Sequence, residues 1–229
     1  MKLVVTPEMD QHTAKILLGK VDAGHTEYQA ILDFVGPSDV VVDIGAGSMA
    51  CALLVAKQGA RVIAYEPSPA LIGVASENLE NNPNLQVEAY FGWGVCPAYR
   101  GKRDKLRLPG SSFDEASFES ACLPPHDGAP VPINMIESIE TILHRERPNI
   151  IFVETSGMAC ALVKAVGAMA TNLRPMTIIA RLRTVWEGRD HVNQTISTMG
   201  LFGFRITRSY LGCDGLVFQR PGKEEENPH

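Results

Sequence analysis

Apolar and polar positions between residues 39 and 67 occur in blocks whose lengths are typical of strands and helices. Val40–Val42 is a short, wholly β-branched apolar run, which predicts a strand buried on both faces. The apolar stretch 49–56 predicts a helix, because a basic residue and a terminating glycine follow it at Lys57-Gln58-Gly59. A second strand is predicted from Arg61 to Tyr65. The pattern therefore predicts a β-α-β unit with a glycine-containing turn after its first strand.

Strand-length and helix-length blocks continue to alternate as far as residue 220, which predicts an α/β fold. The predicted helices are Ser68 to about Glu80, a segment with Ile133, Ile136, Ile139 and Leu143 on one face, Met158–Thr171, and Val192–Met199. The predicted strands are Leu85–Tyr90, Asn149–Val153, Pro175–Leu182, and an antiparallel pair at Gly203–Tyr210 and Gly215–Arg220. We expect one domain over residues 1–220 with an irregular insertion at 95–130, followed by a polar tail at 221–229.

The turn after the first strand has residues that suit an adenosine-type cofactor. Gly45 and Gly47 let the backbone approach a ligand closely, and the start of the following helix offers unpaired N–H donors. Glu66, at the end of the second strand, is placed to accept both hydroxyls of a ribose. The run Gly45 to Ala50 also matches the dinucleotide pattern G-x-G-x-x-G/A. Asp43 would face a pyrophosphate but attract the ammonium and sulfonium of S-adenosylmethionine, so it favours S-adenosylmethionine.

The stretch VVVDIGAGSMACALLVAKQGARVIAYEP resembles the cofactor motifs of class I methyltransferases, and more narrowly of the FkbM-type branch. Gly47 stands where that branch usually has Asn, and Met49 replaces its last glycine. In a later motif Gly157 matches the family's glycine and Glu154 stands where the family has aspartate, while Ser156 and Ala159 replace two glutamates. The positions matched in the first motifs are Asp43, Gly45, Ala46, Glu66 and Pro67, with Asn78 or Asn82 downstream and Gly24 and Glu27 upstream.

The resemblance implies a doubly wound, mostly parallel seven-stranded sheet with a C-terminal antiparallel hairpin, and short strands such as Lys105–Leu108 in the insertion. It implies a methyltransferase that uses S-adenosylmethionine, with O-methylation of a small or carbohydrate-like acceptor. Glu27 would lie near the methionine moiety, and Trp93, at the end of the third strand, could cover the adenine. A hydroxyl acceptor needs a base. The candidate bases are His191, His126 and Glu154.

Two other functions remain open from the residues alone. A nicotinamide-dependent oxidoreductase would use the same glycine turn and Glu66, although Asp43 argues against it. A methyltransferase-like binding module without catalysis would keep the cofactor turn, and the replacements at Ser156 and Ala159 favour it.

The composition of the chain limits the classes of partner and the cellular compartment that we expect. The chain has 229 residues, a formal net charge of −5 and 45% hydrophobic residues. The charge argues against a general nucleic-acid binder, so we do not expect a nucleic-acid partner, although a local basic groove is not excluded. The five cysteines are scattered and never spaced C-x-x-C, which argues against a zinc site and a disulfide framework and suits the cytoplasm. No apolar run approaches a membrane span or a signal peptide, so we expect no membrane partner. The sequence leaves open whether the protein forms a homo-oligomer.

Overall fold

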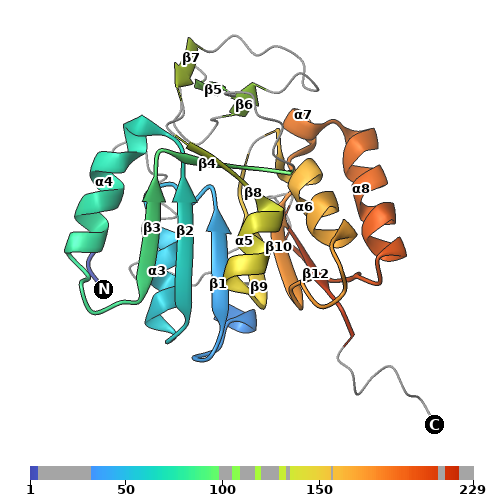
Figure 1. The fold of residues 1–229 in the computed structure, drawn as a ribbon, viewed down its shortest axis with the longest axis horizontal. Coiled ribbons are helices and arrows are strands. Elements are labelled where there is room, and N and C mark those ends of the chain that lie inside the picture. The colour runs from blue at the N-terminus through green and yellow to red at the C-terminus, as the bar shows by residue number, and fades with distance from the viewer. Residues whose placement is uncertain are drawn as a thin grey trace.

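A seven-stranded sheet forms the centre of the protein (Figure 1), and its strands run in the order β11-β12-β10-β9-β1-β2-β3. The computed structural model describes residues 1–4, 32–97, 105–108, 117–119, 129–132, 135–155, 157–210 and 215–221. The strands are β1 Val40–Ile44, β2 Arg61–Glu66, β3 Val87–Phe91, β9 Ile150–Val153, β10 Thr177–Arg181, β11 Arg205–Tyr210 and β12 Gly215–Gln219. The first five strands pair in parallel, and β12 is antiparallel to both β10 and β11. The predicted sheet and its C-terminal hairpin are therefore confirmed.

Helices cover both faces of the sheet, as its buried and largely apolar central strands require. Successive side chains of β1 point to opposite faces, so Val41 joins the core beneath α3 while Val42 joins the core beneath α5 and α6. In Figure 1, α5 lies in front of the sheet and α3 behind it. The helices are α3 Ala50–Lys57, α4 Pro69–Glu80, α5 Ile139–Glu146, α6 Ala159–Ala168, α7 Thr184–Glu187 and α8 Arg189–Leu201. Among the helices of the described residues, none is long and apolar enough to cross a bilayer.

The helix predicted to carry Ile133, Ile136, Ile139 and Leu143 on one face is wrong at Ile136. Ile136 lies in a strand, β8 Met135–Ser138, which pairs in parallel with β4 Trp93–Cys96. Helix α5 begins only after Ser138, whose Oγ accepts a hydrogen bond from the Thr141 N–H. A serine N-cap sets the start of a helix, and apolar spacing alone does not reveal it. Ile133 lies outside the described residues.

Three short strands lie within the long connection between β4 and β8. They are β5 Lys105–Leu108, β6 Ser117–Glu119 and β7 Ala129–Pro132, and they form a separate antiparallel sheet in the order β6-β5-β7. The strand expected at 105–108 is thus present. This small sheet lies beyond the carboxyl ends of the central strands (Figure 1), the edge at which open α/β sheets bind ligands.

Candidate functional site

The turn after β1 is held against the neighbouring strand ends. The N–H groups of Gly45 and Ala46 both donate to the carbonyl oxygen of Tyr65 in β2, at 3.0 and 3.1 Å. Gly45 has a φ of +87°, and a Cβ at this position would lie 2.3 Å from the carbonyl oxygen of Glu154, just after β9. Glycine is therefore required at position 45 by both the backbone angle and the close approach of another strand end.

Glu66 joins this turn to the start of α4. Its Oε2 accepts a hydrogen bond from the Gly47 N–H, and its Oε1 accepts one from the Ser68 N–H, both at 2.7 Å. Glu66 and the following Pro67 are buried. Burial raises the pKa of Glu66 to about 7, against the two backbone N–H donors, and the nearby Glu154 carboxylate adds to the rise. The predicted cofactor residue is thus a buried acid that links the turn to the next helix.

Asp43 is the most deeply buried of the acids at this edge. Its side chain is 2% exposed, and neither carboxylate oxygen has a hydrogen-bond partner among the described residues. Burial raises the pKa of Asp43 well above its ordinary value, and the carboxylates of Glu154 and Glu66 raise it further. A buried carboxylate without a partner is costly unless a ligand satisfies it. Asp43 therefore marks a position that a cation or hydrogen-bond donor would stabilise.

Glu154 lies directly after β9, as the sequence predicted, and its carboxylate is already paired. Oε1 accepts a hydrogen bond from Arg181 Nη1 at 2.6 Å, and both side chains are about three-quarters buried. The neighbouring Thr155 is buried, and its Oγ1 has no hydrogen-bond partner among the described residues. The carboxyl ends of β1, β2 and β9 thus carry three acids, Asp43, Glu66 and Glu154. Of these, Glu154 forms an ion pair with Arg181.

Met49 occupies the position where the related motif has glycine. Its φ is +66°, in the left-handed region that glycine adopts without strain, and its side chain is fully buried in the core beneath α3. The turn therefore keeps the backbone geometry of a glycine at this position. The methionine side chain packs into the core, and its burial offsets part of the backbone strain.

Asn78 connects α4 to the turn and to the beginning of the chain. Its Nδ2 donates to the carbonyl oxygen of Ser48 at 2.9 Å, and its Oδ1 accepts from the Val4 N–H at 2.6 Å. Asn82 accepts from the Lys2 N–H and donates to the Lys2 carbonyl oxygen. Both asparagines that the resemblance singled out therefore hold backbone groups, and Asn78 supports the turn directly.

Trp93 lies in a row of aromatic rings on the α5 face of the sheet. Its ring meets the Tyr90 ring edge-on at 5.4 Å between centroids, and Tyr90 stacks on the buried Tyr65 at 4.9 Å. The contacts described for Trp93 are thus packing contacts, and its suggested place over an adenine stays a prediction. Glu27, His126 and Ser156 lie outside the described residues.

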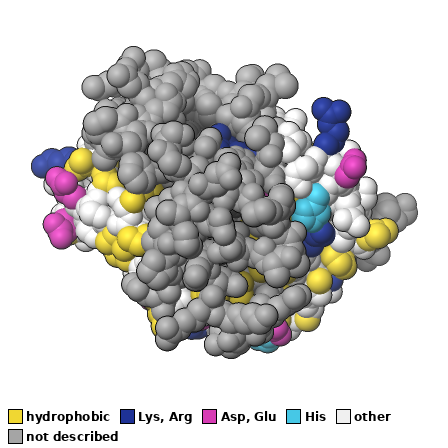
Figure 2. Space-filling model, turned by 90° about the horizontal axis from the view of Figure 1, so that it is seen from above, with side chains coloured by type: hydrophobic (Ala, Val, Ile, Leu, Met, Phe, Trp, Pro, Cys, Tyr) yellow, Lys and Arg dark blue, Asp and Glu magenta, His cyan; other side chains and the backbone are white. Residues whose placement is uncertain are grey.

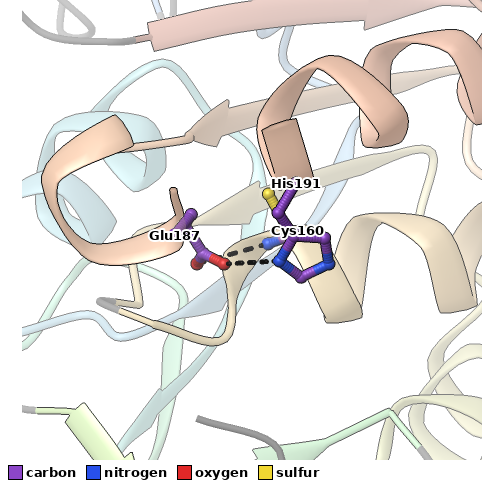
Figure 3. A group of neighbouring side chains, drawn as sticks. All are labelled: Cys160, Glu187 and His191. Atoms are coloured by element: carbon purple, nitrogen blue, oxygen red, sulfur yellow. Dashed lines mark hydrogen bonds and ion pairs between the residues drawn. The ribbon is translucent and has the colours of Figure 1, made fainter. Parts of the chain in front are cut away.

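His191 lies in the first turn of α8 and is already surrounded by charged groups. Its Nε2 is 2.8 Å from Lys164 Nζ, and its Nδ1 is 3.8 Å from Glu187 Oε2. Burial, together with the Lys164 ammonium, lowers the pKa of His191. Figure 3 shows His191 and Glu187 beside Cys160, which lies in the first turn of α6. Sequence analysis missed Cys160, Lys164 and Glu187. The spacing of Glu187 and His191, four positions apart, was the local sequence pattern that could have indicated their proximity.

The described residues of the face beyond the strand ends carry basic, acidic and hydrophobic side chains interspersed (Figure 2). The charge on this part of the surface is therefore mixed, in keeping with the small net charge of −5.

Comparison with known proteins gives one short sequence match and several fold-level likenesses. No protein-family model matches the chain. Over 51 residues, 22% of the chain, the sequence is 49% identical to ribosomal RNA small subunit methyltransferase A of Thermotoga petrophila. The aligned part is 20% of that protein, so the chain spans about a fifth of the length of the curated relatives it matches.

Two solved structures illustrate the likeness in fold. Precorrin-6y C5,15-methyltransferase from Geobacter metallireducens superposes with a TM-score of 0.49 and 14% identity, over 84% of this chain and 88% of that chain. Magnesium protoporphyrin IX methyltransferase from Synechocystis, solved with bound SAH, superposes with a TM-score of 0.47 and 11% identity, over 92% of this chain and 83% of that chain.

The expectation that the protein has no nucleic-acid partner is wrong. It rested on the net charge of −5, yet the curated relatives matched over 51 residues are named ribosomal RNA methyltransferases. Net charge describes the average over the whole chain, whereas contact with a phosphate backbone needs only a local group of basic side chains.

Proposed function

We propose that the protein is an S-adenosylmethionine-dependent methyltransferase, with the cofactor held at the turn after β1. The observation that carries the proposal is Asp43, a buried carboxylate at a strand end whose oxygens have no hydrogen-bond partner among the described residues. S-adenosylmethionine supplies the methyl group and brings an ammonium and a sulfonium, and Asp43 would attract these charges. The short match to a ribosomal RNA methyltransferase supports the same activity.

The grouping of acids favours this cofactor over a nicotinamide dinucleotide. Glu154 and Glu66 each raise the pKa of Asp43, so the three carboxylates already repel one another across the turn. A pyrophosphate placed there would add negative charge, whereas a cationic ligand would relieve the repulsion. Glu66 would hold the ribose, and the turn of Gly45, Ala46 and Gly47 would provide close backbone contact. Pro67 and Glu27 stay proposed cofactor residues on the resemblance alone.

Calorimetric titration tests the choice of cofactor. S-adenosylhomocysteine is expected to bind with one site per chain, and NAD is expected to give no measurable heat under the same conditions, because its pyrophosphate would face Asp43. A clear NAD signal with none for S-adenosylhomocysteine would contradict the proposal. Binding of S-adenosylhomocysteine without turnover on any acceptor would instead support the non-catalytic module.

Replacing Glu66 with alanine is expected to weaken S-adenosylhomocysteine binding by roughly 1–3 kcal/mol, because a charged hydrogen-bonding partner is lost. Calorimetry gives the change in affinity, and thermal unfolding shows whether the variant remains folded. Glu77→Ala is the matched control, since Glu77 is an exposed glutamate of α4. Affinity equal to wild type in a folded Glu66→Ala protein would show that the ribose is held elsewhere.

The acceptor has two candidates, each with its own support. The FkbM-type resemblance supports an oxygen on a small or carbohydrate-like molecule, and the short match to ribosomal RNA methyltransferases supports RNA. Transfer of a labelled methyl group to ribosomal RNA or to hydroxyl compounds, measured in parallel, separates the two. For a hydroxyl acceptor the proposed bases are His191, His126 and Glu154. Glu154 would first have to release Arg181, and His191 would have to release Lys164.

A further inference from the structure

Three side chains of metal-binding type converge at the carboxyl edge of the sheet, away from the cofactor turn in sequence (Figure 3). Cys160 lies in the first turn of α6, Glu187 ends α7, and His191 lies in the first turn of α8. One ligand atom of each lies within 4.8 Å of the other two. Because the residues come from three helices, the spacing of cysteines along the chain does not reveal the group.

The group contains a buried oxygen that lacks a hydrogen bond. Glu187 is 7% exposed, and its Oε2 has no hydrogen-bond partner among the described residues. His191 Nδ1, at 3.8 Å, is too far for a hydrogen bond. Two ligand atoms about 2.0–2.2 Å from a tetrahedral ion lie roughly 3.3–3.5 Å apart. Glu187 Oε2 and His191 Nδ1 are 3.8 Å apart, so a bound ion would draw the two side chains slightly closer together.

We propose that Cys160, Glu187 and His191 bind a zinc ion. Thiolate, imidazole and carboxylate are the three protein ligand types of zinc, and the thiolate selects against magnesium and calcium. Three protein ligands leave a fourth position for water or another ligand. The proposal needs neither S-adenosylmethionine nor an acceptor. A zinc-bound His191 could not also act as a base, so His126 and Glu154 would remain as the proposed bases for a hydroxyl acceptor.

Binding the ion requires a proton to leave the cysteine. Zinc binds cysteine as the thiolate, so the thiol must lose its proton when the ion binds. Zinc would form a bond to sulfur, and the thiol proton would pass to the buffer. Zinc affinity is consequently expected to rise with pH.

Lys164 is the neighbouring group that opposes the ion. Its ammonium lies 2.8 Å from His191 Nε2, the ring nitrogen that faces away from Glu187. Zinc on Nδ1 leaves a proton on Nε2, so Lys164 must then turn aside. Lys164 is only half-buried, which leaves it room to do so. Removing its charge with Lys164→Gln is expected to strengthen zinc binding.

Zinc titration of the purified full chain against a chromophoric chelator tests the proposal. We expect one ion per chain, with affinity at least about 100-fold lower in Cys160→Ala, Glu187→Gln and His191→Asn. Matched controls are Cys96→Ala, a buried cysteine of β4, and His144→Asn in the last turn of α5, and both are expected to bind as wild type. Circular dichroism checks that each variant is folded.

Cobalt substitution gives a spectroscopic readout of thiolate binding in the wild-type protein itself. Cobalt in the wild-type site is expected to show a thiolate-to-metal charge-transfer band, which Cys160→Ala removes. Absence of stoichiometric zinc binding by wild type, or a wild-type cobalt spectrum without the thiolate band, would overturn the proposal. If His191 were only a base, His191→Asn would lower turnover and leave zinc content unchanged, and this result too would contradict the site.

Discussion

Gly45→Ala is expected to lower the free energy of unfolding by about 4 kcal/mol. Alanine at a φ of +87° is strained, which costs roughly 1–3 kcal/mol. Its Cβ would also lie 2.3 Å from the Glu154 carbonyl oxygen, a backbone atom that moves only if β9 shifts, and overpacking of this kind costs a further 1–3 kcal/mol. Urea denaturation followed by circular dichroism measures the change.

Gly47→Ala is the matched control for this prediction. Gly47 also has a positive φ, +56°, but among the described residues, its two chain neighbours aside, no atom lies within 4 Å of the position its Cβ would take. Only the backbone cost of about 1–2 kcal/mol remains. Equal destabilisation by the two substitutions would show that the contact between Gly45 and Glu154 is not the cause.

The free energy of unfolding is expected to contain a pH-dependent contribution from Glu66 of about 3 kcal/mol. The pKa of Glu66 is 4.5 in its ordinary state and about 7 in the fold. Because the folded state binds the proton more tightly, this contribution is fully present below pH 4.5 and is lost as the pH rises through about 7. The difference between the two pKa values corresponds to about 3 kcal/mol.

Glu66→Gln isolates that contribution, since glutamine keeps the size of the side chain and does not titrate. Urea unfolding at several pH values between 4.5 and 8 is expected to show a weaker fall in stability for Glu66→Gln than for wild type. Asp43, whose pKa is raised by burial, by Glu154 and by Glu66, contributes in both proteins, and its contribution is smaller in Glu66→Gln because the Glu66 charge is absent. Glu77→Gln is expected to follow wild type. Parallel curves for wild type and Glu66→Gln would disprove a raised pKa at Glu66.

Local patterns were sufficient to predict the first β-α-β unit and most of the sheet. The β-branched run at Val40–Val42 and the Lys57-Gln58-Gly59 helix end are decided by neighbouring residues, so both agree with β1 and α3. Ile136 was assigned wrongly because spacing of three fits a helix, whereas its pairing with Gly94 comes from a distant segment. The doubly wound arrangement of seven strands came from the resemblance to class I methyltransferases.

The candidate site was predicted only in part. The positions of Asp43 and Glu66 at strand ends follow from the chain itself, and both lie there. The hydrogen bond from the Gly47 N–H to Glu66 was not predicted, because the ribose was the expected partner. The approach of Cys160 to Glu187 and His191 depends on how three helices pack, and single-sequence patterns carry no information on it.

The pairing of β1 with β9 constrains the order in which the protein can assemble. Val41 pairs with Ile150, and the Val40 N–H donates to Asn149, 109 positions later. During synthesis, β1, α3 and β2 emerge early, but the carbonyl of Glu154 that encloses Gly45 follows much later. Closing so long a loop costs chain entropy and slows folding. The turn of the nascent chain therefore acquires its final shape only when about two-thirds of the 229 residues have been made.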